Sequence, residues 1–334
     1  MKVRYEFVDI MKGFCILLVV GNHINVPGLE EYSLSYFRMP LYYLLSGLFF
    51  SQYDSFKTFM TKKTNNLIIP YLFFSLFTCI IALSFIIKNG LFNYHAIFEK
   101  PIPLHNAPIW FLLSLFSTSL LFYTLSFIKS TYYKFMSALF ISWIGYFLGK
   151  HSIHLPLFID TSLSALFFYQ FGSYLNASGI LSDNKKLWTK FIFYTGLFLI
   201  ISHLLMPAKD LELVLNIIPF PFLYYILAGT IGTLSILYLS KVIDRSTITP
   251  IRHVIRPIKY FGKYSIIILG THWIYMKFFA FYIIPHIKAQ LDGKDLWIFF
   301  AIILLLSFPT IYLMKTYLPW FCAQKPLIQI NKKL

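Results

Sequence analysis

Charged residues are scarce in this chain. Of its 334 residues, 13% are charged, 58% are hydrophobic and 20% are aromatic, and the mean hydropathy is +0.68. A typical soluble domain has about 25% charged residues, so the composition excludes an ordinary soluble protein. The long apolar runs between the few charges are typical of membrane-spanning helices rather than of a transmembrane barrel.

Acidic residues and cysteines are scarcer still. The chain has 13 Asp and Glu against 29 Lys and Arg, a formal net charge of +16, and three cysteines, Cys15, Cys79 and Cys322. The basic residues are spread through short loops, which favours contact with anionic membrane lipids over nucleic acid. The cysteines lie in apolar segments and indicate neither a disulfide framework nor a metal site.

The apolar runs predict an all-α, polytopic integral membrane bundle of about ten transmembrane helices. The first run follows Met1-Lys2-Val3-Arg4 as in a signal peptide, but it lacks a small-residue cleavage site and is interrupted by Lys12, so we expect it to be a retained helix. No loop is long enough for a soluble domain, so residues 1–334 are expected to form one transmembrane domain. The predicted spans are residues 8–26, 36–51, 67–87, 108–128, 133–149, 157–175, 189–206, 217–240, 264–284 and 297–314.

The charges of the loops predict the orientation. With the N-terminus in the cytoplasm, ten spans return the C-terminus to the cytoplasm, and most Lys and Arg residues then lie on the inner side. The longest inner loop, residues 241–263, is strongly basic. We therefore expect a multi-pass protein of the cell inner membrane with both termini cytoplasmic.

The first span holds the most informative polar residues, Asp9, Lys12, Asn22 and His23. Ionisable groups inside a membrane helix are costly and are therefore functional candidates. Lys12 and His23 are eleven residues apart, which is three helical turns plus about 20°, so they share a face about 16 Å apart along the axis. They could contact the two ends of one long substrate, or two substrates that meet in the membrane.

Each of these two residues has a functional and a structural interpretation. A neutral imidazole at His23 suits a general base, whereas the alternative is a packing histidine that hydrogen-bonds a neighbouring span. Lys12 could hold a phosphate group of a donor, pair with Asp9 at the i,i+3 spacing, or extend its amine to the headgroups.

Further candidates lie near the ends of the next spans. Arg38 could bind an anionic or carbonyl oxygen, or could reach the outer headgroups. Ser46-Gly47, later in the same span, allows another helix to approach closely. Lys62 and Lys63 precede Pro70-Tyr71 in a basic turn that could bind phosphates or could only reflect the positive-inside rule.

Two candidates lie later in the chain. The ring of Trp110 could stack on a sugar, although Trp is also common at membrane interfaces. His272 is a second intramembrane histidine, with Lys277 nearby. It is a candidate partner for the site around His23, and a structural role is the alternative.

In their order along the chain, these segments resemble the membrane-bound acyltransferase-3 family, whose members O-acylate carbohydrates of the bacterial envelope. The resemblance covers most of the chain. The matching features are a basic residue, ten residues and a histidine (Lys12 and His23), the Met-Pro-Leu-aromatic-aromatic…Ser-Gly segment at 39–47, Pro70-Tyr71, Trp110-Phe111-Leu112, the aromatic-Gly segment at 167–172, and Gly262…Ser265…His272.

The sequence departs from the family pattern at two places. The basic turn of the family often has two arginines three residues apart, where this chain has Lys63 and Asn66. The basic residue of the first span is often Arg in the family, whereas Lys12 offers a point charge rather than a planar fork. These departures bear on how a donor phosphate is held.

The resemblance implies an enzyme, a membrane O-acyltransferase that moves an acetyl group from acetyl-CoA to a hydroxyl of an envelope or exopolysaccharide sugar, without a metal. The acceptor is expected to be a carbohydrate, lipid-linked or polymeric. The expected residues are His23 as general base with Arg38 and His272 as further catalytic residues, Lys12, Lys62 and Lys63 for the donor, and Asn22, Tyr71 and Trp110 for the acceptor.

Two alternatives stay open. A carrier or flippase for a lipid-linked sugar would also be polytopic, basic and rich in aromatic residues, but it would need no acyl donor. A transferase of succinyl or longer acyl groups would share the same motifs, and nothing in the sequence fixes the size of an acyl pocket. The sequence also does not fix the oligomeric state.

Overall fold

The computed structural model describes residues 4–88, 106–205, 208–279 and 292–329. Within these ranges the chain is helical, apart from turns and one isolated antiparallel bridge between Glu212 and Ile217. The expectation of an all-α protein is thus confirmed for the part of the chain that the structure describes.

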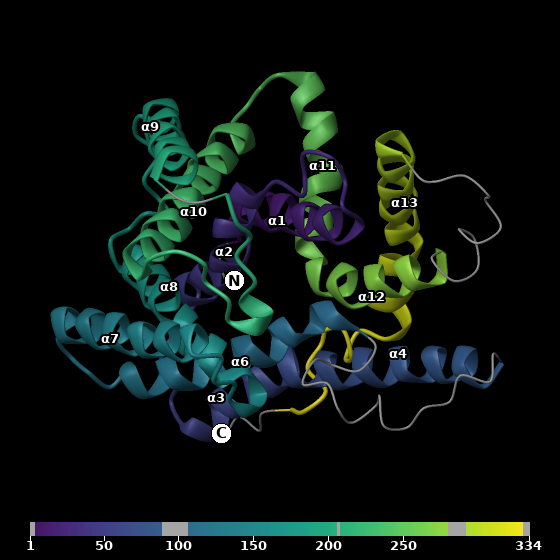
Figure 1. Ribbon diagram of the computed structural model, residues 1–334, viewed down its shortest axis with the longest axis horizontal. Coiled ribbons are helices and arrows are strands. Elements are labelled where there is room, and N and C mark those ends of the chain that lie inside the picture. Colours follow the sequence, from purple (N-terminus) through teal and green to yellow (C-terminus); the bar gives the residue numbers. More distant parts are fainter. Residues whose placement is uncertain (1–3, 89–105, 206–207, 280–291, 330–334) are drawn as a thin grey trace. The chain divides into compact units, whose positions relative to one another are not determined.

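The chain divides into two compact units, which we describe separately. Unit 1 comprises Met1–Gln52 and Ser117–Ser265, and unit 2 comprises Tyr53–Phe116 and Ile266–Leu334. The prediction of a single domain for residues 1–334 stays a prediction. The helices, labelled in Figure 1 where there is room, are α1 (Glu6–Ile24), α2 (Tyr32–Leu48), α3 (Phe56–Lys63), α4 (Ile69–Lys88), α6 (Trp110–Leu125), α7 (Thr131–Lys150), α8 (Ile159–Ala177), α9 (Leu187–Leu199), α10 (Phe222–Asp244), α11 (Thr249–Lys263), α12 (Ser265–Phe278) and α13 (Gly293–Tyr317).

Six of the described helical segments are long and apolar enough to cross a membrane. This agrees with a multi-pass helical membrane protein, whereas ten spans, the inner membrane and the cytoplasmic termini stay predictions. Two of the six include a π-helical turn, at Thr64–Ile68 and Ile200–Leu205. The six segments are Glu6–Ile24, Phe56–Ile81, Ala107–Leu125, Leu187–Leu205, Phe222–Asp244 and Gly293–Tyr317.

Most of the basic segment 241–263, which the sequence placed in a loop between two spans, is helical as α11. Apolar residues at Ile251, Ile255 and Ile258 have the i, i+4, i+7 spacing of one helix face. The later part of that face is covered, since Ile255 is buried whereas Ile251 is exposed. Helix α11 packs on α1 there, and a Cβ added at Gly13 would lie 2.2 Å from the Ile258 carbonyl oxygen. The apolar stripe of α11 is too short, and is interrupted by too many charges, to predict a membrane span. The sequence therefore predicted a loop there.

Glycines set the closest helix crossings in unit 1. A Cβ at Gly47 of α2 would lie 1.8 Å from the Tyr169 carbonyl oxygen of α8, and a Cβ at Gly172 would lie 1.9 Å from that of Leu44. The two helices therefore approach through reciprocal glycines, as small residues allow in membrane bundles. The close approach expected at Gly47 is confirmed.

We predict that Gly47→Ala lowers the free energy of unfolding by about 1–3 kcal/mol, because the new methyl group forces α2 and α8 apart. Thermal unfolding of the detergent-solubilised protein measures the effect. Gly196→Ala, within α9, is the matched control, since a Cβ there meets nothing within 4 Å. Equal melting temperatures for Gly47→Ala and Gly196→Ala would contradict the crossing.

Candidate functional site

The candidate site begins with α1, which is continuous from Glu6 to Ile24. Lys12 and His23 therefore lie on one unbroken helix, and the expected separation of about 16 Å along its axis applies. The helix ends beyond His23 because Asn25 adopts a left-handed conformation (φ 60°), and its N–H donates to the carbonyl oxygens of Asn22 and Gly21. Asn22 and His23 are both partly buried in this last turn.

Lys12 lies in the first half of α1. Asp9 forms an ion pair with Arg4 (Nη2 to Oδ2, 2.6 Å), so Arg4 and not Lys12 is its direct partner. The Tyr42 hydroxyl of α2 donates to the Lys12 carbonyl oxygen at 3.3 Å. The Lys12 side chain is partly buried, and within the described residues its amine has no hydrogen bond or ion pair. The Lys12 backbone is thus in contact with α2, and its amine is available to a ligand.

Arg38 lies on α2, which runs back along α1. The Cys15 thiol donates to the Arg38 carbonyl oxygen at 2.8 Å, so the backbone of Arg38 is level with Cys15, about 12 Å along the axis from the level of His23. The Arg38 residue is only 9% exposed. Its Nη1 atom is buried without a hydrogen-bond partner in the part of the chain described. The role of Arg38 toward a developing oxyanion stays a prediction.

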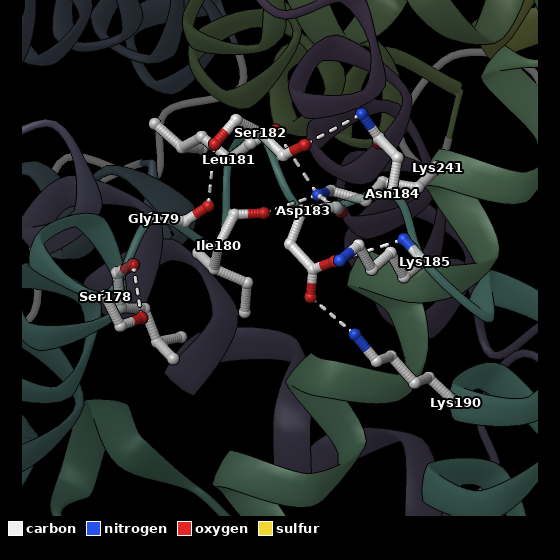
Figure 2. Close-up of polar contacts among 11 residues, drawn as sticks. Ser178, Gly179, Ile180, Leu181, Ser182, Asp183, Asn184, Lys185, Lys190 and Lys241 are labelled. Atoms are coloured by element: carbon white, nitrogen blue, oxygen red, sulfur yellow. Dashed lines mark hydrogen bonds and ion pairs between the residues drawn. The ribbon is translucent and has the colours of Figure 1, made fainter.

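Lys241 of α10 is a buried cation that the sequence analysis missed. It is 2% exposed, and its three N–H groups donate to the carbonyl oxygens of Ile180 (2.5 Å), Asp183 (2.7 Å) and Leu181 (3.3 Å). Figure 2 shows these carbonyl groups converging on the amine from the loop between α8 and α9. The amine also lies 4.9 Å from the centre of the Phe7 ring. All three N–H groups of the amine thus donate to the loop, and Lys241 holds the loop between α8 and α9 in place. We call this contact the clamp.

Two more charge clusters stabilise the same loop and α11. Lys190 hydrogen-bonds Asp183 at 2.5 Å, and this bond holds the pKa of the Asp183 carboxyl below its usual value. Lys259 pairs with Asp244 at 2.8 Å and with Glu6. Burial alone would lower the pKa of Lys259, but these hydrogen bonds outweigh it and the pKa is raised.

Unit 2 holds His272, which is fully buried on α12 with Nδ1 2.7 Å from the Ile268 carbonyl oxygen. Nearby on the chain, the Gly270 carbonyl oxygen accepts a hydrogen bond from Asn106 Nδ2 at 2.8 Å, and the same amide donates to Thr78 Oγ1 at 3.0 Å. Asn106 directly precedes the turn that leads to Trp110, which is itself buried. The roles of His272 beside His23 and of Trp110 against a sugar stay predictions.

The basic turn of unit 2 is organised by Asn65. The Asn65 side chain is buried, donates to the Ile328 carbonyl oxygen at 2.9 Å, and accepts from the backbone N–H groups of Leu327 (2.8 Å) and Ile328 (2.9 Å). Lys62 is exposed and lies over the Tyr53 ring at 4.9 Å. Lys63 and Tyr71 are partly buried, and their binding roles stay predictions.

Two other observations concern ligands. Unit 2 contains an apolar groove of about 390 Å³, with Thr271, Tyr275 and Thr310 among its lining residues. Across the described residues, no group of three or more His, Cys, Asp or Glu side chains is placed to hold a metal ion.

Six described helical segments that are long and apolar enough to cross a membrane indicate a multi-pass membrane protein. A family profile described as an acyltransferase domain matches residues 5–316, nearly the whole chain. The chain belongs to this family, acyltransferase-3, and is a membrane acyltransferase. No curated protein and no solved structure matches it significantly.

We predict that Lys241→Met lowers the free energy of unfolding by roughly 2–4 kcal/mol, because it leaves the loop carbonyl groups without their charged donor. Thermal unfolding in detergent and limited proteolysis of the loop measure this. Lys185→Met, an exposed lysine in the same loop, is the control and should behave as wild type. An unchanged melting temperature and an uncut loop in Lys241→Met would show that the clamp is dispensable.

Proposed function

We propose that this acyltransferase moves an acetyl group from acetyl-CoA to a hydroxyl of an envelope sugar. The acceptor is a carbohydrate of a lipid-linked intermediate, an exopolysaccharide or a lipopolysaccharide, acetylated at the inner membrane. The observation that carries the proposal is the continuous helix α1, which carries a lysine in its first half and a histidine in its last turn. Membership of the acyltransferase-3 family supplies the class of reaction.

In the proposed reaction His23 acts as general base. Its neutral imidazole takes the proton of the sugar hydroxyl while the oxygen attacks the thioester carbonyl of the donor. The tetrahedral intermediate then collapses, the C–S bond breaks, and the departing CoA thiolate takes the proton from His23, which returns to its neutral form. The products are the acetylated sugar and free CoA. The atoms and charges of the reaction balance without a metal or a redox step.

Lys12 is the proposed contact for the donor. Acetyl-CoA is a long polyanion whose reactive thioester lies far from its phosphate groups, so a cation and a base on one helix, about 16 Å apart, suit its two ends. The unused amine of Lys12 favours a phosphate contact there. Lys62 and Lys63 are proposed as further donor contacts, and Asn22, Tyr71 and Trp110 as contacts for the sugar.

We predict that His23→Ala abolishes acetyl transfer, lowering kcat by at least about 100-fold, because general-base catalysis contributes on the order of 10²–10⁴. Purified protein, labelled acetyl-CoA and glycan from cells that lack the gene are used, and glycan acetylation and CoA release are measured together. His253→Ala, an exposed histidine of α11, is the matched control. Full activity in His23→Ala would exclude His23 as the base, and glycan movement without any CoA release would favour a carrier.

We predict that Lys12→Met raises the KM for acetyl-CoA about tenfold, because it removes one charge-assisted contact to phosphate. Lys12→Arg keeps the charge and should retain most of the affinity. The discriminating substrate is the acetyl thioester of N-acetylcysteamine, which lacks the phosphate groups. With this truncated donor, Lys12→Met and wild type should be equal, and an equal loss with both donors would argue against a phosphate contact.

A further inference from the structure

The segment between α9 and α10 contains a loop that is docked into unit 1, residues 209–217, which we call the docked loop. The Glu212 and Ile217 backbones exchange hydrogen bonds of 3.1 and 3.0 Å. The Asn216 side chain, fully buried, donates to the Gly145 carbonyl oxygen and accepts from Ser164 Oγ. The docked loop is thus fixed to α7 and α8.

The docked loop is also attached to α2, one turn from Arg38. The Leu211 N–H donates to Ser35 Oγ at 2.9 Å, and both residues are buried. The Tyr36 hydroxyl forms a hydrogen bond with the backbone of Lys209. Because Ser35 and Arg38 are three residues apart on one helix, they share a face, and the docked loop lies beside the arginine.

Asp210 stands next to Leu211 in the docked loop, and its carboxylate interacts electrostatically with Arg38. Within the described residues, however, the two side chains do not form an ion pair within 4.0 Å. The Arg38 Nη1 atom is buried without a hydrogen-bond partner there. A buried guanidinium nitrogen without an acceptor is costly, so the site is suited to a ligand oxygen.

The charges decide which ligand fits between the two side chains. An anion would be repelled by Asp210, and a cation would be repelled by Arg38. A neutral polyol satisfies both, since one hydroxyl oxygen can accept from the guanidinium while a second hydroxyl donates to the carboxylate. We propose that Arg38 and Asp210 together bind hydroxyl groups of the carbohydrate acceptor, with Ser35 as a positioning residue that holds the docked loop in place.

This inference rests on the proposed function and assigns Arg38 to the acceptor rather than to the oxyanion. We predict that Asp210→Asn raises the KM for the glycan acceptor about tenfold, with kcat and the KM for acetyl-CoA changed less than twofold. Glu212→Gln is the matched control, because Glu212 is an exposed acid of the same loop, and it should behave as wild type. Asp210→Glu should recover most of the affinity.

Ser35→Ala tests the positioning role. It removes the acceptor of the Leu211 N–H and should raise the same KM by about three- to tenfold. In the double variant with Asp210→Asn the two effects should be less than multiplicative, because both act through one contact. Multiplicative effects would overturn the positioning role of Ser35, and an effect of Asp210→Asn equal to that of Glu212→Gln would overturn the acceptor site.

A binding measurement separates this inference from the proposed function. Glycan extracted from cells that lack the gene is titrated into purified protein without any donor, and binding is followed by thermophoresis. Loss of binding in Asp210→Asn, but not in Glu212→Gln, supports the site even if no acetyl transfer is found. Unchanged binding together with a fall in kcat alone would assign Arg38 and Asp210 to the chemical step and would overturn their role in acceptor binding.

Discussion

The structure depends on how polar and charged groups are satisfied inside an apolar helix bundle. A buried charge is tolerated when it is paired and hydrogen-bonded, and is costly otherwise. Lys241 meets this condition completely, with three carbonyl oxygens and an aromatic ring around its amine. Lys12 and Arg38 do not meet it within the described residues. This difference separates cations that hold the fold from cations that are suited to a ligand.

The glycine crossings give these groups their positions. Gly262 of α11 lies so close to α1 that a Cβ would be 1.8 Å from the Asp9 carbonyl oxygen, one turn from Lys12. Gly47 and Gly172 bring α2 equally close to α8. Because the backbones are in contact at these points, the side chains between them have little room to shift, and α1 and α2 present their polar residues from fixed backbones.

Periodicity and local motifs in the sequence predicted only part of this arrangement of helices and polar side chains. They predicted helix α1 with its Lys12–His23 spacing and the close approach at Gly47, since both depend on neighbours along one helix. Lys241 and Asp210 were not predicted from the sequence, because the carbonyl group that binds Lys241 and the arginine that interacts with Asp210 lie far away in the chain. A hydrogen bond to a backbone carbonyl oxygen cannot be predicted from the sequence, because every residue has such an oxygen. Helix α11 was missed because its apolar stripe is interrupted by cations, although that alternation is itself the mark of an amphipathic helix.

The charge distribution along α1 and α2 differs between their two ends. Around the first turns of α1, Arg4 pairs with Asp9, and Lys259 pairs with Glu6 and Asp244, which leaves Lys12 as a cation without a carboxylate partner among the described residues there. Farther along, the carboxylate of Asp210 is an acidic group that interacts electrostatically with Arg38. The proposed polyanionic donor therefore suits Lys12, and the proposed polyol acceptor suits Arg38 with Asp210. If the donor and the acceptor bind in this way, the phosphate groups of the donor stay near Lys12 and away from Arg38 and Asp210. The acyl group is then the part of the donor that extends along α1 toward the acceptor.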